Sequence, residues 1–233
     1  MIDNLVDESI DLLRQWEPPT GYYLAFSGGK DSITMLRLCD MAGVKYTSHY
    51  SCLGLDHKEL MAFIRTEHPT VEWLRPKRSL MALMKTKKIL PTRFRRWCCD
   101  LKHTSPKNVR LLTGVRKQES SKRAILQCAN YDNRSKEMVI RPIFRWKDTD
   151  VWQFIADQKL KYCSLYDAGY KRLGCVACPL LAQRDRLVEL ERHPWAAAWW
   201  WNAAGLVAKA RTLAGKVDLA EQAELYDWWK AQP

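Results

Sequence analysis

Short runs rich in apolar, β-branched or aromatic residues recur between residues 20 and 145, separated by stretches in which apolar residues have helical spacing. Such runs, bounded by glycine, proline and polar residues, are typical of buried strands. They predict strands at 22–26, 44–50, 71–74, 109–113 and 138–143. Helices are expected over 2–16, from about 33 to Gly43, over 60–68, around 80–84, and after Thr149 as an N-cap. This alternation predicts a doubly wound α/β fold, a parallel sheet with helices on both faces.

The pattern changes in the last quarter of the chain. Residues 180–230 lack strand signals and are expected to be helical. Many of the 11 tryptophans lie there, namely Trp195, Trp199, Trp200, Trp201, Trp228 and Trp229. These rings either stack on nucleic-acid bases or pack against a core or partner, and their helical spacing favours packing. We therefore expect a nucleotide-binding domain with the cysteine site over residues 1–182 and a helical C-terminal extension over 183–233.

The segment Ser27-Gly28-Gly29-Lys30-Asp31-Ser32 follows the first predicted strand and opens a helix. Its two glycines allow a tight turn and close approach of the backbone to a ligand. Amides at a helix N-terminus bind anions, and the serine hydroxyls and the lysine add donors. The glycine spacing is shorter than in a Walker loop. The segment therefore predicts a site for a phosphate or sulfate group, most simply that of a nucleotide.

Four of the eight cysteines form two pairs, Cys98-Cys99 and Cys175-x-x-Cys178. Four thiolates from two separate segments can hold a zinc ion or an iron–sulfur cluster. Because the side chains of adjacent cysteines diverge, the pair suits a larger cluster better than a single ion. We expect a 4Fe-4S cluster, with zinc as the alternative. Simple burial of Cys98 and Cys99 is a further interpretation.

The formal net charge of +12 favours anionic partners such as nucleotides or nucleic acid. The run Arg93, Arg95 and Arg96 is a candidate for polynucleotide contact, although basic runs are usually solvated. The first residues are acidic and show no signal-peptide core, and no apolar run is long enough to cross a bilayer. We expect a cytoplasmic protein, in which eight cysteines favour metal or redox chemistry over disulfides.

Several ordered motifs together make the chain resemble the phosphoadenosine phosphosulfate reductase family, within the PP-loop superfamily of adenine-nucleotide alpha-hydrolases. The resemblance runs from about residue 20 to 182. Its motifs are SGGKDS at 27–32, RWCCDLK at 96–102, TGVR at 113–116 with Glu119-Ser120, RPI at 141–143 with Trp146 and DVW at 150–152, and GCVACPL at 174–180.

The resemblance implies the doubly wound nucleotide-binding fold inferred above. In members with this cysteine pattern it also implies a 4Fe-4S cluster, here on Cys98, Cys99, Cys175 and Cys178. The expected ligand is ATP or a related adenine nucleotide, with magnesium shielding its charge. The candidate binding residues are Ser27, Gly28, Gly29, Lys30, Asp31, Ser32, Gly54, Asp56, Gly114 and Arg116, and the catalytic candidates are Lys30, Asp31, Lys102 and Arg116.

Some of these candidates also have simpler interpretations. Arg116 follows a predicted strand and a glycine, so it is expected either to reach a phosphate or to form a surface salt bridge. Asp56 follows Gly54 and is expected either to bind ribose or magnesium or, more simply, to cap a helix. Lys102 and His103 lie beside the cysteine pair; they either polarise a leaving group or a sulfur species, or they are simply solvated.

One departure from the family concerns the reaction. Reductases of adenylyl sulfate use a nucleophilic cysteine near the C-terminus, in a Glu-Cys-Gly type of motif, and no cysteine follows Cys178 here. We therefore expect that this chain alone does not release sulfite. The expected activity resembles that of the ATP pyrophosphatases of DNA phosphorothioation systems, with adenylation of an oxygen, release of pyrophosphate and insertion of sulfur.

The expected partners follow from that activity. The acceptor would be DNA or RNA, and the sulfur would come from a donor protein such as a cysteine desulfurase. The alternatives are a sulfonucleotide reductase for adenylyl sulfate or its 3′-phosphorylated form, with the missing thiol supplied by a partner, and a non-catalytic, cluster-bearing nucleotide-binding subunit. No membrane association is expected, and the oligomeric state stays open.

Overall fold

The computed structural model describes residues 2–102, 105–133 and 135–233, and His103 lies outside this range. The chain forms two compact units. The first comprises Met1–Ser51, Lys58–Leu74 and Ser105–Leu173, and the second comprises Cys52–His57, Arg75–Thr104 and Gly174–Pro233. This grouping differs from the expected division at residue 182, because the segment after Gly174 groups with the C-terminal helices. The division into domains stays a prediction.

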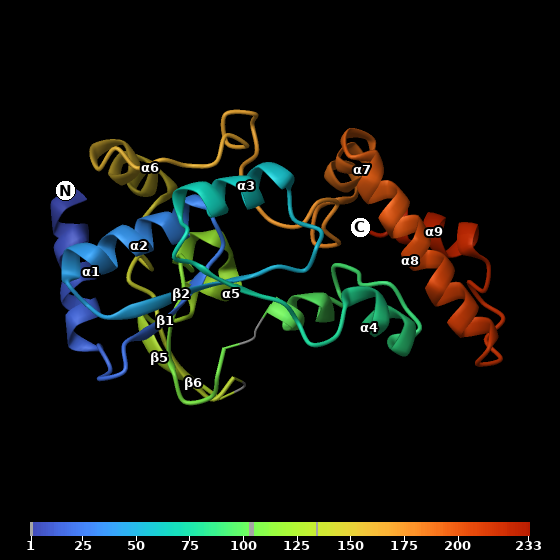
Figure 1. Cartoon of the computed structure of the whole chain (residues 1–233), viewed down its shortest axis with the longest axis horizontal. Helices are drawn as coiled ribbons and strands as arrows, with labels where there is room; N and C mark the ends of the chain where they lie inside the picture. Colours follow the sequence, from blue (N-terminus) through green and yellow to red (C-terminus); the bar gives the residue numbers. More distant parts are fainter. Residues whose placement is uncertain (1, 103–104, 134) are drawn as a thin grey trace. The chain divides into compact units, whose positions relative to one another are not determined.

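The first unit is built on a six-stranded sheet with the order β3-β2-β1-β4-β6-β5. Figure 1 labels β1, β2, β5 and β6 of this sheet. The strands are β1 (Tyr22–Phe26), β2 (Tyr46–Ser51), β3 (Glu72–Leu74), β4 (Arg110–Leu112), β5 (Ala129–Asp132) and β6 (Glu137–Ile140). Every pair is parallel except β5 with β6. The fold is the expected doubly wound α/β class.

The strand order reverses direction at β1. The chain proceeds from β1 to β2 and β3 on one side, and β4 then pairs with β1 on the other side. In open parallel sheets, ligands bind beyond the carboxyl ends of the strands at such a reversal. The segments after β1 and β4 are therefore the expected ligand-binding loops.

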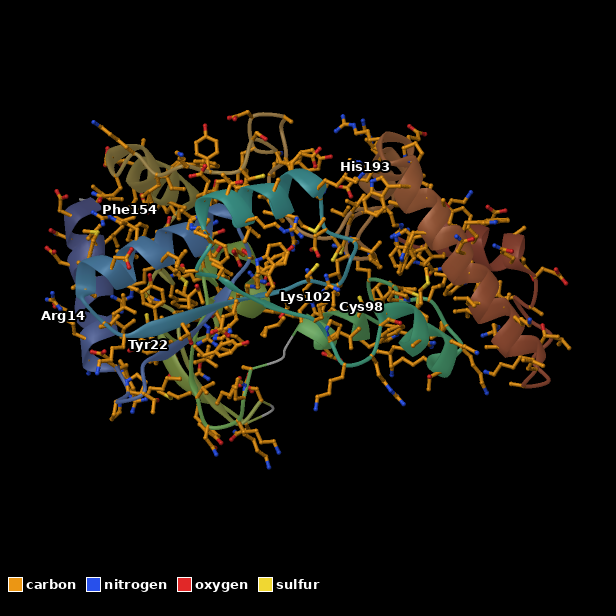
Figure 2. All side chains as sticks on the ribbon, viewed as in Figure 1. Arg14, Tyr22, Cys98, Lys102, Phe154 and His193 are labelled. Atoms are coloured by element: carbon orange, nitrogen blue, oxygen red, sulfur yellow. The ribbon has the colours of Figure 1, made fainter. Side chains whose placement is uncertain are left out.

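The helices of the first unit are α1 (Ile2–Gln15), α2 (Lys30–Ala42), α3 (Lys58–Glu67), α5 (Ser121–Ala124) and α6 (Asp148–Asp157), with a 3₁₀ turn η2 (Lys117–Glu119). Helix α2 packs against both α1 and α6. Strand β1 is almost completely buried, and the Tyr22 hydroxyl donates to the Leu13 carbonyl at 2.7 Å. Tyr22 is labelled in Figure 2. Burial of apolar residues from β1, α2 and α6 fixes the position of the segment that follows β1.

Two details of the first unit differ from the expectations. Strand β5 was not predicted, because its four residues, Ala-Asn-Tyr-Asp, are few and include no β-branched residue. Helix α6 begins at Asp148, so Thr149 is not its N-cap. The Asp150 carboxylate accepts the backbone N–H of Lys147 at 2.7 Å, which satisfies an amide before the first turn.

The second unit is helical. It contains α4 (Leu80–Lys87), the 3₁₀ helix η1 (Trp97–Lys102), α7 (Gln183–Arg192), α8 (Pro194–Thr212) and α9 (Gln222–Lys230). Helix α8 packs against α4, α7 and α9. The indole rings of Trp200 and Trp229 are fully buried and stacked, with centroids 4.3 Å apart. These two tryptophans therefore form the core of this unit, which confirms the packing interpretation for them.

None of the helices in the described part of the chain is both long enough and apolar enough to cross a membrane.

Candidate functional site

The glycine-rich segment lies at the carboxyl end of β1, where the strand order reverses. Gly29 is the N-cap of α2, so the loop ends on the first turn of that helix. The hydroxyl of Ser32 donates to the Gly29 carbonyl at 2.8 Å and accepts the Ser27 amide at 3.2 Å. The Gly29 amide donates to the Ser27 hydroxyl at 3.3 Å. These bonds hold the loop with its amides around the positive end of the helix.

Gly28 has a backbone conformation that few other residues adopt. Its φ of +71° lies in the left-handed region. A Cβ there would lie 2.6 Å from Leu60 Cδ1 and 2.8 Å from Ile64 Cδ1. Both the backbone angle and the packing against α3 therefore require glycine at this position.

Two buried cations lie beside the loop. The side chains of Lys30 and Arg116 are 7% and 4% exposed. Lys30 Nζ lies 3.2 Å from Asp148 Oδ1 and 3.5 Å from Asp31 Oδ2. Arg116 places Nη2 2.7 Å from Asp148 Oδ1 and Nε 2.7 Å from Asp31 Oδ1, although the second contact is not aligned as a hydrogen bond. Two positive and two negative groups thus form one network.

Gly114 brings the segment after β4 close to this network. A Cβ on Gly114 would lie 3.1 Å from Asp31 Cβ and 3.3 Å from the Asp31 carbonyl carbon. The absence of a side chain allows the close approach that places Arg116, two residues later, against Asp31 and Asp148. Arg116 was expected either to reach a phosphate or to form a surface salt bridge. It forms ion pairs with Asp31 and Asp148, and its own side chain is buried while both carboxylates are partly exposed.

Tyr166 completes the surroundings of the loop. Its hydroxyl accepts the backbone N–H of Lys30 at 3.0 Å, and its ring lies 5.8 Å from Lys30 Nζ. Burial raises the pKa of Tyr166 to about 12, so the hydroxyl stays protonated at neutral pH. This hydroxyl accepts from an amide at the helix N-terminus, which is a position that a phosphate oxygen can take.

The charges of this network balance one another in the free protein. Burial tends to raise the pKa of Asp148, but Lys30 and Arg116 outweigh this effect and lower it. Asp148 is therefore ionised at neutral pH, and together with Asp31 it balances the two cations in the free protein. A phosphate group can compete for Lys30 and Arg116, and the released carboxylates then become available to a divalent cation.

The second unit contains the cysteine segments. Cys98 and Cys99 lie on η1, and Cys175 and Cys178 lie on the segment that precedes α7. The Val176 amide donates to the Leu55 carbonyl at 2.7 Å, and the Ala177 amide donates to the Glu189 carboxylate. Ala177 is fully buried with a φ of +49°, so the turn between the two cysteines is held in an unusual conformation.

The four thiols act on one another. The pKa of Cys98 is raised by a hydrogen bond with Cys99 and by burial, and Cys175 and Cys178 raise it further. The pKa of Cys99 is lowered by that hydrogen bond and by Lys102 and Arg96, against the effect of burial. Burial also raises the pKa of Cys175, to about 12. The fold of the second unit therefore brings both predicted pairs into one neighbourhood.

Whether this neighbourhood fits a metal group depends on the size of that group. No three His, Cys, Asp or Glu side chains of residues 2–102, 105–133 and 135–233 are placed to hold a metal ion. A single zinc ion requires thiolates that converge on one point. An iron–sulfur cluster takes one thiolate at each of several irons, so it requires thiols that line a wider space. The donor set, four cysteine sulfurs, has the chemistry of either group.

Lys102 and Asp56 lie beside the cysteines (Figure 2 labels Lys102 and Cys98). Lys102 Nζ is 3.2 Å from Asp56 Oδ1, and Cys175 Sγ is 3.9 Å from the same oxygen. Burial lowers the pKa of Lys102, but Cys175 and Asp56 outweigh it and raise it. Lys102 is thus a fixed positive charge near the thiols. Asp56 is buried and ion-paired in this unit, and the binding roles of Asp56 and Gly54 toward a nucleotide stay predictions.

The predicted residues thus fall into two groups. The first unit brings together the loop, Gly114 and Arg116, and the second brings together Asp56, Lys102 and the four cysteines. Sequence reasoning missed Asp148 and Tyr166. The sequence held one weak signal for Asp148: this residue lies two positions before the DVW motif and follows a predicted strand.

The sequence match to known proteins agrees with this architecture. The model of the phosphoadenosine phosphosulfate reductase domain matches residues 21–181. The chain therefore belongs to the phosphoadenosine phosphosulfate reductase family.

Similar proteins include an adenosine 5′-phosphosulfate reductase of Neisseria meningitidis, which is 34% identical over 114 residues, covering 46% of this chain and 44% of the relative. An uncharacterised protein of Methanocaldococcus jannaschii is 27% identical over 190 residues, covering 73% of this chain and 44% of the relative. The chain thus spans less than half the length of these curated relatives.

Solved structures share the fold. A phosphoadenylyl-sulfate reductase from Candida auris superimposes with a TM-score of 0.50 at 18% identity, covering 75% of this chain and 93% of that one. FMN adenylyltransferase from Candida glabrata, in complex with FAD and inorganic pyrophosphate, gives a TM-score of 0.55 at 14% identity, covering 75% and 64%.

Proposed function

We propose that this protein binds ATP at the loop Ser27–Ser32 and cleaves it between the α and β phosphates to activate an acceptor for sulfur insertion. The observation that carries the proposal is the pair of buried cations, Lys30 and Arg116, at the N-terminus of α2. Two buried positive charges, added to a cradle of amides and hydroxyls, match the charge of a pyrophosphate moiety.

The relatives support the choice of an adenine nucleotide. The family takes its name from the reduction of phosphoadenosine phosphosulfate. The relative in Neisseria meningitidis is named as a reductase of adenosine 5′-phosphosulfate. FMN adenylyltransferase, which shares the fold, has been solved with FAD and inorganic pyrophosphate. Both kinds of ligand carry an adenosine and an anhydride-linked anion, and we propose the same combination for this chain.

The proposed reaction has two steps. First, an oxygen of the acceptor attacks the α phosphorus, the new oxygen–phosphorus bond forms, and the bond to the β phosphate breaks, so that pyrophosphate leaves with the electron pair. Second, hydrosulfide attacks the activated acceptor, the bond to the adenylylated oxygen breaks, and AMP leaves. Lys30 and Arg116 stabilise the negative charge that develops on pyrophosphate. Asp31 and Asp148 would hold magnesium, which would shield the charge of the phosphates.

Cys98, Cys99, Cys175 and Cys178 would hold the metal group, and a 4Fe-4S cluster suits their common neighbourhood. When bound, such a cluster would supply inorganic sulfide held between irons that the four thiolates ligate. Lys102, ion-paired with Asp56, keeps a positive charge beside the thiolates and stabilises them.

The sequence of the Neisseria relative favours one alternative, reduction of an adenylyl sulfate. That reaction needs a thiolate that attacks the sulfonyl sulfur. Burial raises the pKa of the Cys39, Cys52 and Cys163 thiols, which disfavours all three as the attacking group. We therefore rank ATP cleavage above sulfonucleotide reduction.

Parallel assays on the anaerobically reconstituted full chain distinguish the two reactions. One assay follows AMP and pyrophosphate from ATP with a nucleic acid and sulfide present, and the other follows sulfite from adenylyl sulfate with a dithiol reductant. We expect AMP and pyrophosphate in the first and no sulfite in the second. Catalytic release of sulfite, with ATP left intact, would contradict the proposal in favour of the reductase.

A further inference from the structure

An exposed aromatic residue stands between arginines just before the cysteine pair. The side chain of Phe94 is 80% exposed, and Arg93, Arg95 and Arg96 are exposed around it. All four lie within the second unit, a few residues before η1. An exposed phenylalanine flanked by arginines offers an aromatic face and positive charge to the same ligand.

The turn that carries Phe94 is well anchored. The Thr92 amide donates to the Arg95 carbonyl at 3.3 Å, and the Arg95 amide donates to the Thr92 carbonyl at 3.1 Å and to the Thr92 hydroxyl at 3.2 Å. Thr92 itself is buried. Arg93 and Phe94 therefore occupy the tip of a closed turn, whose base is fixed in the core of the unit.

The C-terminal helices hold the chain that leads into this turn. The indole N–H of Trp229 on α9 donates to the Pro91 carbonyl at 2.9 Å, and Arg211 Nη1 on α8 donates to the Lys88 carbonyl at 3.0 Å. Trp229 is fully buried and Arg211 nearly so. A turn supported in this way loses little conformational freedom when it binds a partner, because it is already ordered.

The charges of the turn are available to a ligand. No carboxylate in the described part of the chain forms an ion pair with Arg93, Arg95 or Arg96. The exposed Lys85 and Lys87 of the preceding helix α4 add positive charge nearby in the sequence. Arginine pairs with phosphate through a planar, forked set of donors, and an aromatic face beside it offers a platform for a base.

We propose that the turn Thr92–Arg95, together with Arg96, binds single-stranded nucleic acid. A base stacks on Phe94, and the arginines contact the phosphates on either side. A single strand fits better than a duplex, because a lone protruding ring needs an unstacked base. The inference rests on the proposed function only in identifying the class of its acceptor, since the binding itself requires neither ATP nor turnover.

Fluorescence anisotropy of the full chain, without nucleotide, tests the surface. The probes are a fluorescein-labelled thymidine strand of about 15 nucleotides, a uridine strand of equal length and a duplex, each titrated over a range of salt. Phe94→Ala should weaken binding of the strands about 5- to 100-fold with an unchanged salt slope, and Phe94→Trp should retain it. The Arg93→Gln, Arg95→Gln, Arg96→Gln triple variant should lower the magnitude of the slope by about 2.

A matched control keeps the net charge equal. The Lys45→Gln, Lys122→Gln, Lys159→Gln triple variant removes three exposed charges from the first unit and should leave the slope nearly unchanged. The strand that binds more tightly, DNA or RNA, identifies the type of acceptor.

Three outcomes would overturn the inference. They are wild-type affinity in Phe94→Ala, an equal loss of slope in both triple variants, and binding of anionic phosphatidylserine vesicles in place of the strands. If the strands do not bind this turn but AMP and pyrophosphate still form from ATP with another acceptor, the nucleic-acid-binding role of the turn is refuted and the proposed reaction is left intact. All replaced side chains are exposed, so folding should be retained, and thermal unfolding checks this.

Discussion

Replacement of Arg116 by glutamine should weaken ATP binding strongly. The Arg116 side chain is 4% exposed and lies 2.7 Å from both Asp31 and Asp148, so water cannot easily replace the lost charge. A hydrogen bond to a charged group contributes about 1.5–3 kcal/mol. At about 1.4 kcal/mol for each tenfold change, the expected loss of ATP affinity is about 10- to 100-fold.

The same substitution should also lower the free energy of unfolding, but by less than the loss typical of a buried pair. Removal of one partner of a fully buried ion pair costs about 3–5 kcal/mol. Asp31 and Asp148 are 23% and 53% exposed, so water can solvate the carboxylates that remain. We expect a loss of about 1–3 kcal/mol, which leaves a folded protein for the binding experiment.

Isothermal titration calorimetry with magnesium-ATP measures the effect, and urea unfolding measures stability. Arg145→Gln is the matched control, because the Arg145 side chain is 65% exposed and pairs only loosely with Glu8, at 3.4 Å. The control should bind ATP like the wild type. A folded Arg116→Gln protein with wild-type ATP affinity would refute the assignment of Arg116 to the anion site.

Three further predictions concern the loop and the cysteines. Anaerobic preparations should contain iron and acid-labile sulfide, and Cys98→Ser should lose most of both; stoichiometric zinc without iron would contradict this. Tyr166→Phe should tighten ATP binding about 2- to 10-fold in calorimetry, because the Lys30 amide no longer donates to a hydroxyl; unchanged or weaker binding would show that the hydroxyl does not compete with phosphate. Because the pKa of Asp148 is lowered, its stabilisation is present above the ordinary value of 3.8 and is lost as pH falls below it. The difference in unfolding free energy between wild type and Asp148→Asn should therefore shrink from pH 7 to pH 3, and a constant difference would refute the pairing.

The central part of the sheet could be predicted from the sequence, because its strands are buried. Strand β1 has the predicted bounds, and Gly43 ends α2 in a left-handed conformation as expected. Strand β5 could not be predicted in the same way. It pairs with β6 at one edge of the sheet, and its four residues are at least partly exposed, so its sequence has no run of β-branched or strongly apolar residues that would mark a buried strand.

The candidate site shows a similar division between local and long-range information. The loop Ser27–Ser32 could be recognised because its glycines, hydroxyls and lysine are contiguous. Asp148 and Tyr166 contact Lys30 although they lie more than 110 residues away in the sequence. The strand order that brings them together cannot be read from any local motif. The two cysteine pairs could be recognised by spacing, but their proximity depends on how the second unit folds.

Exchange of labelled pyrophosphate into ATP tests the central claim most directly, since it reports reversible cleavage between the α and β phosphates. The experiment uses the anaerobically reconstituted full chain with magnesium, ATP and a single-stranded nucleic acid, without a sulfur source, so that the adenylylated acceptor accumulates. The account predicts that label enters ATP in the wild type, and that Arg116→Gln abolishes most of this exchange while Arg145→Gln retains it. Absence of exchange in a wild-type protein that binds ATP, or equal exchange in Arg116→Gln, would contradict the account.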